Sequence, residues 1–401
     1  MKSSTPPHVL PIIVFAQFAG TSLWFAGNAV VPDIIQELGL LEALVGFITT
    51  AVQAGFITGT LVFAALSIAD RFSPVKIFLL CSIAGALANL TIIFGSGFTT
   101  VMLSRFITGF FLAGIYPVGM KIASDWYKEG LGKALGYLVG ALVVGTAFPH
   151  LVKYLGSNLE WRFVLIATSF VSSAGGLLLF LTVKDGPHRQ KAGIFKPSAM
   201  FTLFSNKNFR SAAFGYFGHM WELYTFWAFV PVMLAYYTSL HSTAGINVSL
   251  YSFLIIGAGG ISSAIGGHIS LKKSSKKVAL YSLLFSGISC LILPFFYGTP
   301  TVVFLLLLFI WGLSVIPDSP QFSTLVAQSS DSSYVATGLT IVNSIGFAIT
   351  IVSIQLVNIA WVYFENPFVF WIMLMGPMAG LAAISRYKTS RTARKLSSPN
   401  T

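Results

Sequence analysis

The sequence predicts an all-α membrane protein whose twelve transmembrane helices form two pseudo-symmetric six-helix bundles. Of its 401 residues, 55% are hydrophobic and only 9% are charged, and the mean hydropathy is +0.81. Soluble domains carry roughly 25% charged residues, so this chain could not cover a soluble globule with polar side chains. Its apolar residues also come in runs of about 20 or more, the length that an α-helix needs to cross a bilayer. These runs lack the alternation that a transmembrane β-barrel requires, which leaves helices.

Twelve apolar segments meet this length requirement. The predicted helices cover residues 9–31, 43–68, 75–95, 100–122, 132–152, 162–183, 210–237, 247–270, 278–297, 301–323, 334–358 and 367–385. The first is longer than the core of a signal peptide, so we expect it to be retained. Cys81 and Cys290 lie inside predicted helices, and two isolated thiols there indicate neither a disulfide framework nor a metal site.

The basic residues indicate how the chain is oriented. If the N-terminus is cytoplasmic, 21 of the 24 lysines and arginines fall in cytoplasmic segments, while Lys153 and Arg162 lie in an outer loop and Arg105 lies inside a helix. By the positive-inside rule, both termini then face the cytoplasm and the protein resides in the cytoplasmic (inner) membrane. The net charge of +12 is thereby explained, so we expect the lipid bilayer as a partner and no nucleic acid.

A long polar connection divides the chain near its midpoint. We expect a six-helix bundle at residues 1–183, a cytoplasmic central loop at 184–208, and a second six-helix bundle with a cytoplasmic tail at 209–401. An offset of about 200 residues relates the halves, since NAVVP ending at Pro32 matches WAFVP ending at Pro231, and Pro117 matches Pro317. Such a constant offset indicates duplication. Two bundles related by an axis along the membrane normal can rock about a central site.

Short motifs lie at the ends of several predicted helices. A-D-R-F at residues 69–72 follows the second helix, R-F-I-T-G at 105–109 lies in the fourth, and E-W-R-F at 160–163 precedes the sixth. They resemble the GxLADRxGRK loop, the RxxxG element and the WRxxF opening of the major facilitator superfamily, although Leu66 and Ser73 replace usual glycines. The resemblance covers essentially the whole chain. It implies a monomeric solute transporter that alternates between inward-open and outward-open states.

Two departures from the family patterns bear on the substrate and the direction of transport. The Gly-Pro antiporter signature of the fifth helix is represented only by Gly140, Gly145 and Pro149, which favours uptake over exchange. Members that carry nitrate place an arginine in the second helix and another in the eighth. Neither predicted helix contains one here, so nitrate is disfavoured.

Glu222 is the outstanding polar residue, because it lies about twelve residues into the seventh predicted helix. An acid at the bilayer centre costs roughly 2.5–3.5 kcal/mol on insertion scales. His219 and Phe226 share its helical face, which we expect to look into the bundle interior. There Glu222 could take up and release a proton, with His219 sharing the proton or orienting the acid. The alternative is a structural hydrogen bond to a neighbouring helix. Trp221 and Tyr224 of the same helix are further candidates for substrate contact.

Charged residues in other helices have two interpretations each. Arg105 either reaches the headgroups or, as the family resemblance implies, acts in the interior in proton coupling or in binding an anionic group. Lys121 and Asp318 lie toward the cytoplasmic ends of the corresponding fourth and tenth helices, where they either pair across an inner gate or are interfacial charges. Asp70 and Arg71 either belong to a switch that engages a facing helix in one state or form a solvated turn.

Further polar and amphipathic residues could line a midplane cavity, although packing between helices would use the same residue types. They are Gln17, Asn28, Tyr116, His150, Tyr224, Trp311, Gln321 and Asn343.

The leading hypothesis is a secondary active transporter of a small organic solute, coupled to protons through Glu222. Within transport, the alternative is a passive facilitator. A membrane-embedded enzyme is not expected, because the sequence has no cluster with metal-ligand spacing, no nucleophile with a paired base and no phosphate-binding loop, and no cofactor is expected either. A sensor that keeps the fold without transport stays open. A small organic anion, a zwitterion and a planar amphiphile are all compatible substrates.

Overall fold

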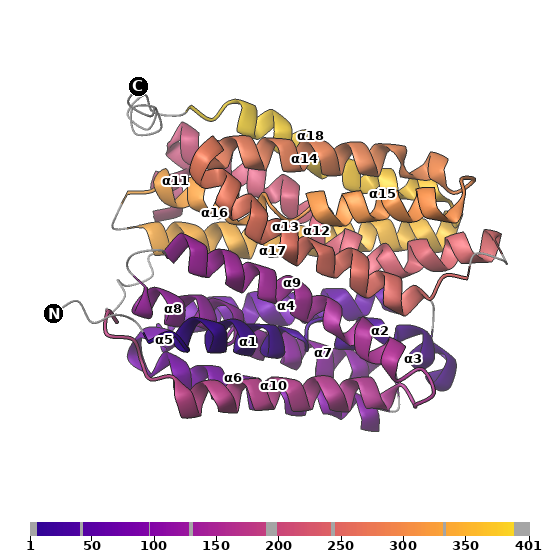
Figure 1. Cartoon of the computed structure of the whole chain (residues 1–401), viewed down its shortest axis with the longest axis horizontal. Coiled ribbons are helices and arrows are strands. Elements are labelled where there is room, and N and C mark those ends of the chain that lie inside the picture. Colours follow the sequence, from indigo (N-terminus) through magenta and orange to yellow (C-terminus); the bar gives the residue numbers. More distant parts are fainter. Residues whose placement is uncertain are drawn as a thin grey trace.

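Long, nearly parallel helices make up almost all of the structure, a computed structural model that describes residues 6–40, 43–95, 97–127, 131–189, 199–241, 245–331 and 334–388 (Figure 1). Among these residues, eleven helical segments are long and apolar enough to cross a membrane, and α1 (Val9–Thr21) adds a shorter apolar helix. The structure therefore agrees with the predicted twelve crossings.

The first six crossings come from ten α-helices and one 3-10 turn. After α1 these are α2 (Ala26–Ala29), α3 (Val31–Leu38), α4 (Leu44–Ala65), α5 (Ile68–Arg71), α6 (Pro74–Leu90), η1 (Thr91–Phe94), α7 (Phe98–Leu112), α8 (Tyr116–Trp126), α9 (Leu131–Leu155) and α10 (Arg162–Thr182).

The second half repeats this plan after the central connection. Its elements are α11 (Ala199–Ser205), α12 (Lys207–Leu240), α13 (Val248–Lys273), α14 (Ser275–Ile292), η2 (Leu293–Phe296), α15 (Thr301–Ser314), α16 (Ser319–Gln328), α17 (Val335–Phe364), η3 (Pro367–Phe370) and α18 (Trp371–Ser385). The segment 184–208 is thus not a simple loop, since it contains α11 and the first two residues of α12, while residues 190–198 lie outside the described residues.

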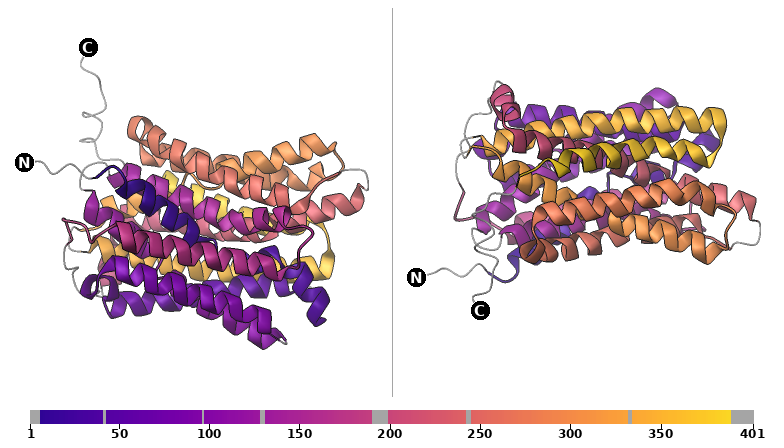
Figure 2. Two further views of the ribbon diagram at one scale, coloured as in Figure 1. Left: turned by 60° about the horizontal axis from the view of Figure 1, so that its bottom comes forward. Right: turned by 90° about the horizontal axis from the view of Figure 1, so that it is seen from above.

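The two halves lie side by side, with the first half coloured indigo to magenta and the second coloured salmon to yellow in Figure 1. The helix α1 begins and α18 ends at the same end of the molecule, which we call the terminal side; the opposite end is the distal side. Figure 2 shows the same near-parallel packing from two further directions. The even number of crossings returns the chain to the side from which it started.

Three crossings are broken, which the sequence analysis did not predict. The expected continuous helices 100–122 and 301–323 are interrupted at residues 113–115 and 315–318, close to Pro117 and Pro317. A proline removes a backbone donor and clashes with the preceding turn, so both breaks lie where the duplicated prolines would place them. The expected helix 9–31 is also wrong, because residues 22–25 form turns between α1 and α2. Its counterpart α12 runs unbroken for 34 residues.

The halves approach most closely where α9 meets α13. A methyl group added at Gly140 would lie 3.0 Å from the carbonyl oxygen of Gly260, and one added at Gly260 would lie 2.9 Å from the oxygen of Gly140. These distances leave room only for glycine. Small residues let membrane helices approach backbone to backbone, which strengthens their van der Waals packing.

Candidate functional site

On the distal side, side chains of α17 join the second half to the first. Asn358 accepts a hydrogen bond from the backbone N–H of Gly46 (3.2 Å) and donates one to the carbonyl of Ala43 (3.0 Å). Gln355 donates to the hydroxyl of Thr50 at 2.7 Å. These are the side-chain hydrogen bonds that join the two halves among the described residues, and all of them lie at the distal end of α4. The distal side is therefore the closed side.

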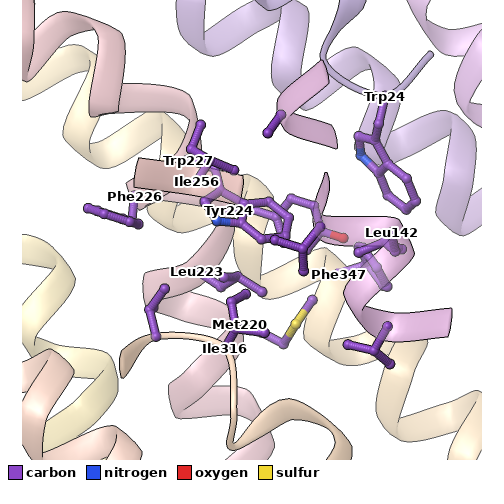
Figure 3. Close-up of a cluster of buried hydrophobic side chains, with 14 of the residues drawn as sticks. Trp24, Leu142, Met220, Leu223, Tyr224, Phe226, Trp227, Ile256, Ile316 and Phe347 are labelled. Atoms are coloured by element: carbon purple, nitrogen blue, oxygen red, sulfur yellow. The ribbon is translucent and has the colours of Figure 1, made fainter. Parts of the chain in front are cut away.

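At mid-depth, aromatic side chains from both halves meet in a cluster that we call the midline aromatic cluster. Its members are Trp24, Phe25, Phe56, Tyr224, Trp227 and Phe347. The ring of Trp24, from the break after α1, lies 5.7 Å from that of Tyr224 and 5.8 Å from that of Phe347 (Figure 3). Trp24, Tyr224 and Trp227 are buried. The rings of the two halves therefore pack against each other at this level.

A cavity of about 80 Å³, which we call the midline cavity, lies against this cluster, with Phe56 and Phe347 in its wall. Its lining comes from α4, α8 and α17 and consists of Phe56, Ile57, Thr60, Tyr116, Pro117, Met120, Thr340, Asn343, Ser344 and Phe347. The structure thus brings together Tyr116 and Asn343, two of the residues expected at the midplane, from opposite halves. Hydroxyl, amide and aromatic groups line this cavity, and its lining contains no charged residue.

Glu222 lies in the interior of the second half and has no exposed surface. One carboxylate oxygen accepts a hydrogen bond from Nε1 of Trp311 at 2.7 Å, and the other accepts one from the hydroxyl of Ser286 at 2.9 Å. The ring of Phe226 packs on Trp311 with centroids 4.4 Å apart. The expected face of α12 therefore looks toward α14 and α15, away from the lining of the midline cavity. Ser286 was missed, since small polar residues inside helices are too frequent to single out.

His219, one turn before Glu222, contacts the other side of the break in the tenth crossing. Its Nδ1 atom lies 2.9 Å from a carboxylate oxygen of Asp318, and both side chains are buried. Asp318 therefore does not pair with Lys121, which was one of the two interpretations of these residues. The reason is local: the break turns Asp318 inward, toward α12 of its own half.

Arg105 is fully buried, so it does not reach the headgroups. Its guanidinium donates to the carbonyl oxygens of Leu23 (3.1 Å) and Trp24 and to the amide oxygen of Asn89 (3.1 Å). The last carbonyls of a helix lack partners within the helix, and a cation is favoured there. Arg105 thus supplies the donors for the turn after α1, which explains why the first crossing can break inside the membrane. At the corresponding position of the second half, Leu305 has no such donors, and α12 is unbroken.

On the terminal side, Lys121 lies 3.0 Å from Asp70 and 3.5 Å from Asp125. Asp70 therefore contacts a basic side chain of its own half, and its role in a switch stays a prediction. Arg189 donates to the carbonyl oxygens of Asp70 (3.0 Å) and Phe72 (2.7 Å), a contact that the sequence analysis missed. Arg71 is exposed and forms no ion pair with the residues that the structure describes.

Comparison with known proteins decides the family. The family model of the Major Facilitator Superfamily matches residues 13–354. The chain belongs to the major facilitator superfamily. The crystal structure of a mutant of the nucleoside transporter NupG is similar, with a TM-score of 0.72 and 16% identity over 95% of this chain and 99% of that one. The proton:xylose symporter XylE bound to 6-bromo-6-deoxy-D-glucose is also similar, with a TM-score of 0.69 and 14% identity over 93% and 95%.

The remaining expected residues pack between helices of this major facilitator fold. Trp221 donates to the carbonyl of Ile372 at 2.8 Å, and Asn28 donates to the hydroxyl of Thr49 at 2.6 Å. Gln17, His150 and Gln321 are buried outside the midline cavity. Ser73, where the superfamily usually has glycine, caps α6 by accepting from the N–H of Lys76 and donates to Asp185 at 2.8 Å.

Proposed function

We propose that this protein is a secondary active transporter that takes up a small, uncharged polar organic solute across the cytoplasmic membrane by alternating access, coupled to protons. The observation that carries the proposal is the carboxylate of Glu222, buried inside a major facilitator fold and hydrogen-bonded to Trp311 at 2.7 Å. An ionisable residue at this depth is costly, and such residues commonly mark proton relays.

The chemistry of the cavity supports an uncharged solute. Thr60, Tyr116 and Asn343 offer hydroxyl and amide groups, and Phe56 and Phe347 offer aromatic faces. Solute pockets combine mostly apolar walls with a few polar groups that fix orientation. A solute whose ring carries several hydroxyl groups would pack on the aromatic faces and form hydrogen bonds with the polar groups. The similar structures are of a nucleoside transporter and a xylose symporter, and this makes nucleosides and sugars the first solutes to test.

The contacts of the proton site join α12 to the tenth crossing. Glu222 contacts Trp311 on α15 and His219 contacts Asp318 at the start of α16, so the two contacts flank the break at residues 315–318. A proton that changes the charge at either contact would change how α15 and α16 are held against α12. Broken helices with such a bistable contact are elements that switching transitions use.

The proposal includes an orientation in the membrane and the bounds of the two moving units. The terminal side is the cytoplasmic side, so the structure is closed toward the outside by the bonds of Asn358 and Gln355. The moving units are residues 1–183 and 209–401, joined by 184–208. In each transport cycle the contacts of α17 with α4 break and new contacts form on the cytoplasmic side.

Uptake into proteoliposomes tests the proposal. A thermal-shift panel of nucleosides, pentoses and hexoses, with organic anions and amino acids for comparison, identifies a stabilising solute, because a ligand that binds the folded state raises its stability. We expect its uptake to accelerate when the outside is made acidic. Glu222→Gln should abolish this response while leaving exchange of labelled for unlabelled solute intact. The control Glu365→Gln removes an exposed carboxylate and should behave as the parent protein does.

Two outcomes would contradict the proposal. Uptake that ignores the pH gradient in the unmodified protein would establish a passive facilitator. A panel in which only charged solutes stabilise the protein would remove the proposed class of substrate.

A further inference from the structure

A groove of about 600 Å³ lies between α13, α14 and α15 and shares no lining residue with the midline cavity; we call it the α13–α15 groove. Its walls are almost entirely apolar, and several of them, such as Ile265, Tyr281 and Phe285, have exposed side chains. In a membrane protein an exposed apolar face is a lipid-facing one. The groove is therefore a hollow in the surface that the second half presents to the acyl chains.

The length of the groove matches one leaflet of a bilayer. Along α13 its lining extends from Ser262 to Lys273. At 1.5 Å per residue this separation is roughly 16 Å, about half of the ~30 Å hydrocarbon core. The groove thus begins at the terminal-side surface and ends near mid-depth.

Two lysines stand at the terminal-side mouth of the groove. Lys273 ends α13 and Lys277 lies in the first turn of α14; both belong to the lining and both are exposed. Within the described part of the chain, neither ammonium group lies within 4.0 Å of a carboxylate. Their neighbour Lys276 is used differently, since it donates to the carbonyl oxygens of Ser385 (3.3 Å) and Tyr387 (2.6 Å).

In the first half, the position that corresponds to Ser314 is closely packed. About 200 residues before Ser314 of the groove lies Gly114, and a methyl group there would be 2.8 Å from Cβ of Cys81 and 2.9 Å from the ring of Phe63. Side chains of the second and third crossings therefore pack closely against the fourth at this point. The two halves differ there, since Ser314 lines the groove.

We propose that the α13–α15 groove binds one acyl chain of an anionic phospholipid from the terminal-side leaflet, with the headgroup phosphate held by Lys273 and Lys277. The apolar walls and the leaflet-long span fit the acyl chain. The two ammonium groups at headgroup level fit an anionic lipid, since each basic residue near the surface adds attraction to anionic headgroups.

The lipid would lie against the break in the tenth crossing. Leu313, Ser314 and Pro317 belong to the groove wall, and Pro317 immediately precedes Asp318. A bound acyl chain therefore contacts the same turn that His219 contacts from the inside.

Native mass spectrometry of the full chain tests the site. The protein is reconstituted into nanodiscs of phosphatidylglycerol and phosphatidylcholine in equal parts, released into mild detergent, and its retained lipids are counted. We expect phosphatidylglycerol to be retained preferentially. The double variant Lys273→Gln/Lys277→Gln should reduce this preference by roughly fivefold for each lysine. The control Lys272→Gln/Lys388→Gln removes two exposed charges that do not line the groove and should leave the preference unchanged.

A second variant tests the acyl chain separately from the headgroup. Ser262→Phe fills the inner end of the groove without changing its charge, and it should lower the retention of both lipids. The site is refuted if the lysine variant keeps the parent preference, if the control pair loses the preference to the same extent, or if Ser262→Phe retains as much lipid as the parent.

Discussion

Nδ1 of His219 lies 2.9 Å from a carboxylate oxygen of Asp318, and the contact joins the unbroken helix α12 to the break between α15 and α16. Both side chains are buried in the second half, so each depends on the other for its polar partner. The charge state of this pair therefore bears on how firmly the break is held.

Loss of His219 alone should be more damaging than loss of the pair. Removing one partner of a buried charge pair costs about 3–5 kcal/mol, because the other charge is left uncompensated. We expect His219→Asn to lower the melting temperature of the purified protein strongly, and His219→Asn/Asp318→Asn to recover most of the loss. His268→Asn, which changes an exposed histidine of α13, is the control. Equal melting temperatures of the single and double variants would show that the contact carries no charge.

The hydrogen bond from Trp311 to Glu222 can be measured with a double-mutant cycle. Trp311→Phe leaves a buried carboxylate oxygen without its donor, which costs about 1–3 kcal/mol. In a Glu222→Leu background the same change should cost much less, as judged by thermal unfolding. Trp221→Phe removes a donor to the carbonyl of Ile372 instead, so its cost should be the same in both backgrounds. Identical costs of Trp311→Phe in the two backgrounds would show that the bond does not contribute.

Arg105 should determine the order of the turn after α1. Arg105→Lys keeps the charge, but one ammonium group cannot bridge the carbonyls of Leu23 and Trp24 together with Asn89. We expect amide hydrogen exchange at residues 22–25 to accelerate by about tenfold or more, since losing a hydrogen bond to a charged group costs about 1.5–3 kcal/mol. Arg210→Lys changes an exposed arginine that bonds to a single carbonyl and should leave that exchange unaltered. Unchanged protection at 22–25 in Arg105→Lys would contradict this role.

The differences between the predicted and the observed structure have a physical cause. Hydropathy locates whole crossings, because the cost of polar groups in lipid applies along the entire segment. It cannot locate a break, because the turn at residues 22–25 is stabilised by Arg105 from another helix. Glu222 could be singled out because a charge at that depth is rare. Its partners Trp311 and Ser286 depend on how α14 and α15 are rotated, which no local pattern encodes.

The rotation of helices about their own axes also explains why Lys121 and Asp318 do not pair with each other. Both lie toward the terminal side, at corresponding places of the two halves, so the offset alone made them plausible partners. The structure directs Lys121 to Asp70 and Asp318 to His219, each within its own half. The cavity residues Tyr116 and Asn343 were among eight equivalent polar positions, and only the packing of the halves selects them.

Asn358 should hold the distal side closed. Asn358→Ala removes two hydrogen bonds between the halves, each worth about 0.5–1.5 kcal/mol. We expect the distal-open population to rise about fivefold or more, measured as faster maleimide labelling of Thr50→Cys in a background without Cys81 and Cys290. Asn366→Ala removes an exposed cap near the same end that does not join the halves. Equal labelling rates in the two variants would place the closure elsewhere.

Glu37 should make the distal surface sensitive to acid. Hydrogen bonds from Arg162 and then Trp161 lower the pKa of Glu37 from its ordinary value of 4.5. A lowered pKa in the folded state contributes stability that is complete above that ordinary value and is lost as the pH falls through the folded pKa. Glu37→Gln should therefore melt below the parent at neutral pH, with the difference vanishing in acid. Glu365→Gln, which removes an exposed carboxylate that forms no ion pair with the described residues, is the control. A difference that persists in acid would contradict the assignment.

The contact between Gly140 and Gly260 has a mechanical consequence. Side chains at most helix contacts can change rotamer and so absorb part of a displacement, but here bare backbone rests on bare backbone, with a methyl group at Gly140 only 3.0 Å from the facing oxygen. Side-chain rotation at this pair of glycines therefore cannot absorb a displacement. A tilt of one half therefore acts directly on the helix backbone of the other half at this contact.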